Sequence, residues 1–246
     1  MRQLADHLWW IDDIAPAAGV YAWRAAPDEA DRSGDVILFD SGLPWHARPI
    51  LDALRREGIA PGQVRAIVLT HADIDHVGAA RALRQATGAA IVCHAVTAAI
   101  LRDQLARLWG MGWIGRAGGF FARLLAGPLL RALPLEADHL LIDGAPVAGG
   151  FKAIYTPGHC AGHTAFYHPA AHVLIAGDAC ANRGGTLSPA PAIFTADRVT
   201  AAQSVARLAR LDVHLLCCGH GAPIVADAQA RLKELAERLT VPARRC

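Results

Sequence analysis

The sequence predicts a layered α/β fold with mixed sheets. Short apolar runs recur along the chain, helical segments lie between and after them, and the arrangement repeats in two roughly similar halves. The 246 residues suffice for one large domain, and no Ser/Gly-rich linker or block of like charge divides them. We therefore expect a single domain over residues 1–246.

The first half of the chain begins with apolar runs separated by turn-forming residues such as Gly19 and Gly34. These runs predict strands at Leu8–Ile11, Val20–Trp23 and Val36–Phe39. Two helices, each closed by a glycine, alternate with two further strands. The helices are expected at Pro44–Glu57 and Val77–Thr87, and the strands at Ala66–Leu69 and Ala90–Cys93.

A third helix is expected at Val96–Leu108, and it leads into an unusually apolar middle segment, Leu105–Leu133. We interpret residues 96–135 as an apolar helical insert. Three roles stay open, in this order: a helical pair packed on its own domain or on a partner subunit in a homodimer, a lid over the substrate, and a contact with a membrane surface. No apolar run here approaches the roughly 20 residues that span a bilayer.

The second half repeats the pattern of strands with helices after them. Strands are expected at His139–Ile142, Phe151–Tyr155, Ala165–Tyr167, Val173–Ala176 and His214–Cys217, and helices at Asp197–Leu211 and Asp227–Leu239. Residues 182–195, rich in Gly, Pro and Ala, read as a loop, and we expect it to border the active site.

Charge and cysteine content exclude several classes of protein. The chain has 24 Lys+Arg against 22 Asp+Glu, a net charge of +2, so nothing indicates a basic surface for nucleic acid. The N-terminus does not read as a signal peptide. The six cysteines form no C-x-x-C pair and are expected to be mostly small, buried and reduced. We expect a cytoplasmic protein that acts on a small molecule.

Residues 70–78, T-H-A-D-I-D-H-V-G, are the most informative segment. Two histidines and two carboxylates, His71, Asp73, Asp75 and His76, follow an apolar strand directly. Imidazole nitrogens and carboxylate oxygens suit zinc, iron or manganese. A loop at the end of a strand is held in place by a rigid sheet. The segment alone could also be an ordinary polar loop.

Three further segments favour a metal site. His159, Asp178 and His220 each stand beside glycine, and each is expected at the carboxyl end of an apolar strand. Core packing does not explain four strand ends that all carry metal-binding side chains. His163 lies four residues after His159, but Pro157, Gly158 and Gly162 favour a loop there, so we interpret it as a structural or ligand-orienting residue rather than a ligand.

Together these motifs resemble the metallo-β-lactamase superfamily, in the family's order and over about Leu8 to Val225. Asp40-Ser41-Gly42 is similar to the first motif, and residues 71–76 are similar to the H-x-H-x-D-H motif. The resemblance implies an αββα sandwich, two mixed sheets flanked by helices. It also implies two divalent metal ions and an Asp40 that orients ligands rather than binding metal.

The resemblance assigns each candidate ligand to a site. His71, Asp73 and His159 would hold the first metal, Asp75, His76 and His220 the second, and Asp178 would bridge them. Asp73 departs from the family, which usually has histidine there. A carboxylate should shift the preference toward iron or manganese, or else bind poorly; zinc stays the default.

The resemblance implies a hydrolase in which a metal-bridging hydroxide attacks a carbonyl of an ester, thioester or lactone. Asp75 is the candidate for acid and base catalysis. Lactonases and hydroxyacylglutathione hydrolases carry similar motifs. A G-x-S-x-G serine motif is absent from the sequence. Two alternatives stay open: an iron-dependent oxidoreductase such as a sulfur dioxygenase, and a non-catalytic scaffold with the same fold.

Overall fold

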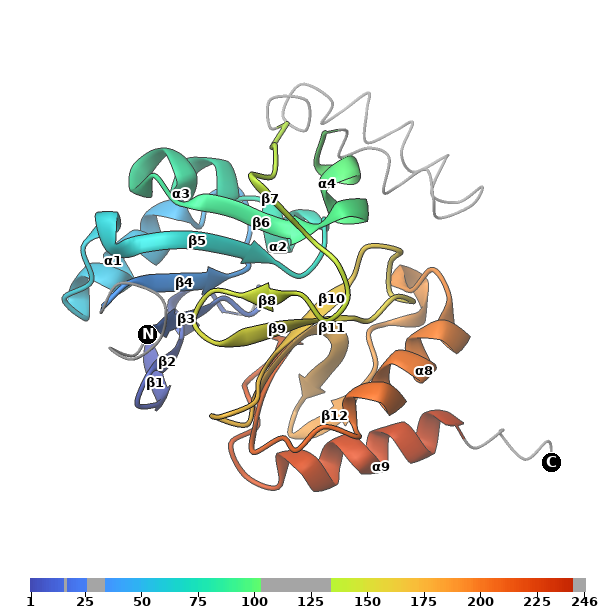
Figure 1. Ribbon diagram of the computed structural model, residues 1–246. Helices are drawn as coiled ribbons and strands as arrows, with labels where there is room; N and C mark the ends of the chain where they lie inside the picture. The colour runs from blue at the N-terminus through green and yellow to red at the C-terminus, as the bar shows by residue number, and fades with distance from the viewer. Residues whose placement is uncertain (16, 26–33, 103–133, 241–246) are drawn as a thin grey trace.

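The computed structural model describes residues 1–15, 17–25, 34–102 and 134–240. Two β-sheets lie face to face, and helices cover the outer face of each, which gives four layers (Figure 1). The predicted layered α/β fold is thus confirmed, in the αββα order that the motifs imply.

The first sheet has seven strands in the order β1-β2-β3-β4-β5-β6-β7. Strands β1 to β4 run antiparallel, whereas β4 to β7 are parallel. The carboxyl ends of these parallel strands therefore meet at one edge. The strands are Arg2–Ala5, Leu8–Trp10, Tyr21–Arg24, Val36–Phe39, Val64–Leu69, Ala90–His94 and His139–Leu141.

The second sheet has six strands, with the path β12-β11-β10-β9-β8 and β13 beside β11. Most neighbours are antiparallel, but β11 and β13 are parallel, so their carboxyl ends lie together. The strands β8 to β13 are Pro146–Val147, Phe151–Tyr155, Thr164–His168, Val173–Arg183, Thr186–Ser188 and Leu215–His220.

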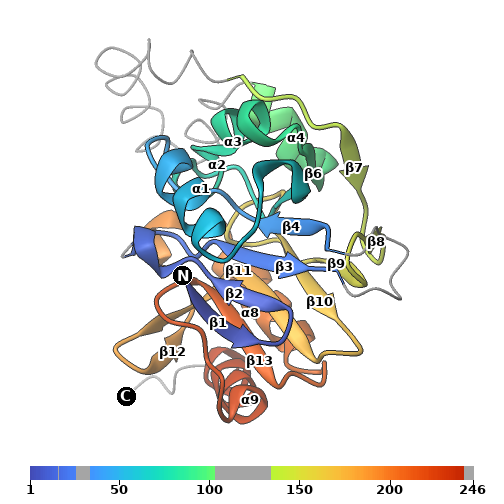
Figure 2. The same cartoon turned by 90° about the vertical axis from the view of Figure 1, so that its left-hand side faces the viewer.

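Three apolar clusters fill the spaces between the four layers. Side chains alternate between the two faces of a strand, so β4 contributes to two of these clusters. Val36 and Leu38 pack toward the helices, whereas Ile37 and Phe39 pack between the sheets. Helices α1 to α4 lie on the first sheet's side of the molecule, and α8 and α9 cover the second sheet (Figures 1 and 2). The helices are Ala47–Arg56, Ile74–Val77, Ala80–Thr87, Ala95–Arg102, Arg198–Leu208 and Ala228–Thr240.

Several predicted elements need correction. The helix expected at Val77–Thr87 belongs to α3, and a separate short helix, α2, precedes it. Gly78 lies between the two helices. Only glycine fits there without a clash, because a Cβ would lie 2.5 Å from the Pro44 ring and the Ile74 carbonyl oxygen. The loop expected at residues 182–195 contains β12 and a 3-10 turn, Ala192–Phe194. Strands β1 and β8 were not predicted, since both are short and largely exposed.

The middle segment is tested only at its ends. The helix predicted at Val96–Leu108 is present as far as Arg102. The segment Leu105–Leu133, and with it most of the expected insert, lies outside the described residues. Within the residues that are described, no helix combines the length and the apolar character that a membrane crossing needs.

Candidate metal centre

The structure brings all seven candidate ligands to one edge of the two sheets. His71 and Asp73 follow β5, and His159 follows β9, as the sequence predicts. Three positions need correction. Asp75 and His76 belong to α2 rather than to a loop, and Asp178 lies inside β11 rather than beyond its end.

An irregularity in β11 places the Asp178 carboxylate. The pairing of β11 with β13 shifts on both sides of Gly177, which has φ +51°. On β13, a Cβ at Gly219 would lie 2.0 Å from Asp178 Oδ1, so only glycine leaves room for that carboxylate. His220 is the last residue of β13. The glycines beside these two residues therefore serve a steric purpose.

The first group of candidate ligands is deeply buried. The ligand atoms of His71, His159 and Asp178 all lie within 4.8 Å of one another. Asp73 adjoins this group: its Oδ2 is 3.1 Å from His159 Nε2 and 3.6 Å from His71 Nε2. The rings of His71 and His159 are nearly perpendicular, at 86°, so their in-plane lone pairs approach from different directions. A tetrahedral site needs such an approach.

The second group comprises Asp75, His76 and His220, whose ligand atoms also lie within 4.8 Å of one another. The rings of His76 and His220 meet at 80°. Asp178 reaches both groups: its Oδ1 is 3.3 Å from His76 Nε2 and 3.5 Å from His220 Nε2, and its Oδ2 is 3.6 Å from His159 Nε2. It therefore occupies the position that a bridging carboxylate requires.

The unpaired atoms at this edge fit metal ions. His71 Nε2, His76 Nε2 and Asp178 Oδ1 are buried and have no hydrogen-bond partner among the described residues. Leaving a buried polar atom unpaired costs about 1–3 kcal/mol. Buried atoms left unpaired at such a cost are suited to ligate cations, which would satisfy them.

Asp40 and Thr70 fix the direction of two imidazoles. Asp40 Oδ2 lies 2.8 Å from His76 Nδ1 and 2.8 Å from the Thr70 hydroxyl, which donates to it. The Thr70 oxygen lies 2.9 Å from His71 Nδ1 and can accept that proton. Both rings then carry a proton on Nδ1 and present Nε2 inward. Asp40 thus has the contacts of the orienting residue that we expected, whereas Thr70 was missed, although it directly precedes His71.

Charge and burial shift the pKa values of these groups in opposite directions. Burial alone lowers the pKa of His76, but the Asp178 and Asp40 carboxylates outweigh it and raise that pKa well above its usual value. Burial raises the pKa of Asp178, but His76 and His220 outweigh it, so the pKa lies well below its usual value. Burial, reinforced by His76, lowers the pKa of His71. Asp178 is therefore ionised and His71 neutral near pH 7, as metal ligands must be.

His163 is buried beside the first group without belonging to it. Its Nδ1 lies 2.8 Å from the Thr156 hydroxyl, and its ring centroid is 5.2 Å from that of His71. Its Nε2 would lie 2.8 Å from a Cβ at Gly177. Burial lowers the pKa of His163 well below the usual value, so the ring is neutral. Its contacts agree with a residue that supports the edge rather than one of the two groups.

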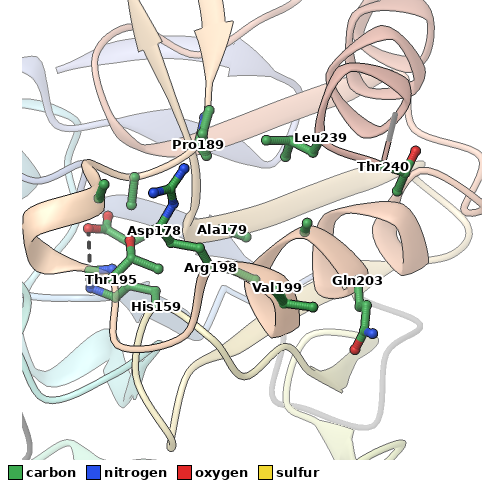
Figure 3. A pocket seen from close by; sticks show the side chains of 14 residues that line it. His159, Asp178, Ala179, Pro189, Thr195, Arg198, Val199, Gln203, Leu239 and Thr240 are labelled. Carbon is green, nitrogen blue, oxygen red and sulfur yellow. Dashed lines mark ion pairs between the residues drawn. The ribbon is translucent and has the colours of Figure 1, made fainter. Parts of the chain in front are cut away.

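A cleft of about 730 Å³ opens beside the first group. His159 and Asp178 form part of its wall, and residues of α8 and of the end of α9 form another part (Figure 3). Pro189, Ala190, Ala192 and Thr195 line it as well, so residues 182–195 do border the candidate site. Cys160 and Cys180, close in sequence to candidate ligands, are buried.

A third His/Asp cluster lies at the opposite ends of the same strands. His172 directly precedes β11, and Asp212 and His214 precede β13, with ligand atoms within 4.8 Å. Its two imidazoles are stacked, with centroids 4.3 Å apart and planes 20° apart. Nearly parallel rings do not direct their in-plane lone pairs at one point. Each ring instead makes an ion-pair contact with Asp212, at 3.1 Å and 3.4 Å.

Comparison with known proteins identifies the family. The family model "Metallo-beta-lactamase superfamily" matches residues 29–220. The chain belongs to the metallo-β-lactamase superfamily. It is 28% identical over 223 residues to "Probable metallo-hydrolase YflN" of Bacillus subtilis, covering 83% of this chain and 82% of the relative. Membership of this superfamily indicates a metal-dependent hydrolase.

Solved structures agree on the fold. The metallo-beta-lactamase family protein TTHA1429 from Thermus thermophilus has a TM-score of 0.69 and 23% identity, over 96% of this chain and 80% of the other. TTHA1623, solved in a di-iron-bound form, has a TM-score of 0.63 and 24% identity, over 89% of this chain and 94% of the other. At these identities the likeness concerns the fold alone.

Proposed function

We propose that the chain is a binuclear metal-dependent hydrolase of small esters, thioesters or lactones. One observation supports this most strongly: two groups of histidines and carboxylates lie side by side, each contains a buried Nε2 without a hydrogen-bond partner among the described residues, and Asp178 reaches both. Such pairs of sites suit two ions a few Å apart. The adjoining cleft is within the usual size range of small-molecule sites.

The candidate ligands divide as the family motifs imply. His71, Asp73 and His159 would hold one ion, Asp75, His76 and His220 the other, with Asp178 between them. When bound, such ions lower the pKa of a shared water and polarise a carbonyl oxygen, which supplies the nucleophile and the electrophile of hydrolysis.

The chain's own residues would orient and move protons around that chemistry. Asp40 and Thr70 hold His76 and His71 with Nε2 inward. The side chain of Asp75 is 31% exposed, so it can exchange protons with solvent. Asp75 is the group that we assign to take a proton from the attacking water and pass it to the leaving group.

Asp73 bears on the identity of the metal. Its carboxylate is a harder, anionic ligand than the usual imidazole, which favours iron or manganese relative to an all-histidine site. Zinc stays our default for the intact pair of sites.

The first test is metal content per chain together with hydrolysis. Protein reconstituted with zinc, manganese or iron is assayed by elemental analysis and against aryl esters, thioesters and lactones. We expect about two equivalents in the wild type, about one in Asp73→Ala, and about two again in Asp73→His, which restores a neutral ligand. The wild type should hydrolyse at least one substrate class.

Each other outcome selects an alternative. Fewer than two equivalents in the wild type under every metal would overturn the binuclear site. Two irons with oxygen uptake on a persulfide and no hydrolysis would replace the hydrolase by an iron-dependent oxidoreductase. Full metal content with neither activity would favour a non-catalytic scaffold.

A further inference from the structure

The cleft beside the metal centre has a nearly uncharged wall. Five of its lining residues are alanines, and Pro189, Val199 and Leu239 add apolar surface. Apart from His159 and Asp178, which belong to the candidate centre, the charged side chain in the described lining is Arg198. Figure 3 shows Arg198 and Thr195 on the same side of the cleft as His159 and Asp178. A guanidinium therefore faces the space that a substrate would fill.

Arg198 is poorly placed for the stability of the protein. It is the first residue of α8, an 11-residue helix, and a cation at a helix N-terminus is disfavoured by the helix dipole. The Asp197 side chain offsets this by accepting from the backbone N–H groups of Val199 and Thr200. A cation at this end of the helix thus needs a reason other than helix stability.

The carboxylate nearest in sequence is already occupied. Asp197 Oδ2 accepts the Thr200 hydroxyl at 2.6 Å, and its Oδ1 accepts the two backbone donors. Over the part of the chain that the structure covers, no ion pair involves Arg198. By contrast, Arg207 on the same helix is 2.9 Å from Asp143. The Arg198 guanidinium therefore has its donors available for a ligand.

These observations lead us to infer that Arg198 binds a carboxylate on the substrate. The inference rests on the proposed function and narrows its substrate class to acyl compounds that carry a second, anionic carboxylate beyond the scissile carbonyl. The planar guanidinium matches a carboxylate with two parallel hydrogen bonds. The described lining holds one cation, Arg198, which matches the single charge of a carboxylate better than the double charge of a phosphate.

Under this inference, three parts of the substrate contact three regions of the cleft. The scissile carbonyl lies at the candidate centre beside His159 and Asp178, a short apolar chain lies along the alanines, and the carboxylate meets Arg198. Because Arg198 is exposed, salt should screen the contact, and the preference for an anionic substrate should weaken as ionic strength rises.

The test compares two thioesters of N-acetylcysteamine with acyl chains of equal length, glutaryl and pentanoyl. The metal-loaded wild type should show a kcat/KM about 10-fold or more higher for the glutaryl thioester. In Arg198→Gln the ratio should fall to about 1–2, mostly through the KM of the glutaryl thioester, and Arg198→Lys should be intermediate because it keeps charge without the planar fork. Equal rates for both thioesters in the wild type would overturn the inference.

Arg210→Gln is the matched control, because Arg210 lies just after α8 and does not line the cleft. It should keep the wild-type ratio, and all variants should keep the wild-type metal content. A ratio that falls equally in Arg210→Gln would reveal long-range charge rather than binding at Arg198.

A binding measurement separates this inference from the proposed function. If neither thioester is hydrolysed, the proposed hydrolysis of thioesters fails, and calorimetry with glutarate and pentanoate still decides the role of Arg198. Tighter binding of glutarate that disappears in Arg198→Gln supports the carboxylate site. Equal binding of both acids, or a preference unchanged in Arg198→Gln, overturns it.

Discussion

The two ends of strands β11 and β13 carry His/Asp clusters that are similar in composition but differ in burial and in the orientation of their imidazole rings. At the carboxyl ends, Asp178 and His220 join the candidate metal centre; at the amino ends, His172, Asp212 and His214 form the surface cluster. In each place two or more imidazoles and a carboxylate come within 4.8 Å. Composition and proximity therefore do not distinguish the two.

Orientation and burial do distinguish them. In the candidate centre the ring pairs meet at 86° and 80°, and unpaired nitrogens of His71 and His76 face the interior. In the surface cluster the rings stack at 20°, and the Asp212 and His214 side chains are 64% and 65% exposed. Water can solvate the second set, whereas the buried atoms of the first set lack a partner that a cation would supply. The comparison teaches that the orientation and burial of the imidazole rings, more than the types of residue present, distinguish a candidate metal site.

The largest effect should come from His76→Ala. His76 Nε2 is buried without a hydrogen-bond partner among the described residues and lies 3.3 Å from Asp178 Oδ1, while its Nδ1 contacts Asp40. Its loss should lower metal affinity and hydrolytic kcat/KM by more than the roughly 10–100-fold typical of residues that only orient ligands. Elemental analysis and a rate assay measure both. Unchanged metal content in His76→Ala would remove it from the ligand set.

Asp40→Asn should have the next largest effect. The amide keeps the shape of the side chain but loses the charge that holds the His76 and Thr70 hydrogens. We expect metal affinity to fall about 10–100-fold with the fold intact. Asp212→Asn in the surface cluster is the matched control and should bind metal as the wild type does. Equal losses in the two variants would contradict the distinction between the clusters.

Acidification should release metal from the candidate centre. The Asp178 carboxylate, 3.5 Å from His220 Nε2, raises the pKa of His220, and the Asp178 and Asp40 carboxylates raise that of His76. Both imidazoles therefore stay protonated to a higher pH than an ordinary histidine with a pKa of 6.5. Protons and metal compete for the same nitrogens. Affinity should therefore keep rising as pH increases past 6.5, by about tenfold per unit for each proton displaced. Zinc titrations between pH 6 and 9 test this, and a flat profile would contradict it.

The smallest effect should come from His214→Ala. This change removes one stacked ring and one exposed ion pair, each of which contributes at most about 1 kcal/mol. Metal content and hydrolysis should match the wild type, and the melting temperature should change by a few degrees at most. A loss of one metal equivalent would show that the stacked rings reorient to bind an ion. That result would contradict the conclusion that the surface cluster is not a metal site.

Much of the fold was predictable because local patterns and the sheet agree. The run Val36–Phe39 was predicted and found without change, since each of its four residues is buried on one face or the other. Strands β1 and β8 lack such runs and depend on pairing with a neighbour. Asp178 was placed beyond a strand end because its glycine reads as a terminator. In the structure Gly177 permits a bulge within a longer strand.

The sequence by itself indicated which residues are candidate metal ligands, because imidazoles and carboxylates beside strand-ending glycines are a local pattern. It also determined the family, since the motifs occur in a fixed order along the chain. Only the tertiary structure decided which His/Asp cluster converges, since ring orientation depends on Asp40 and Thr70, which lie 30 residues apart. It alone brought Arg198 to the cleft, because α8 packs on the second sheet and the Asp197 backbone N–H donates to the Gly158 carbonyl beside His159.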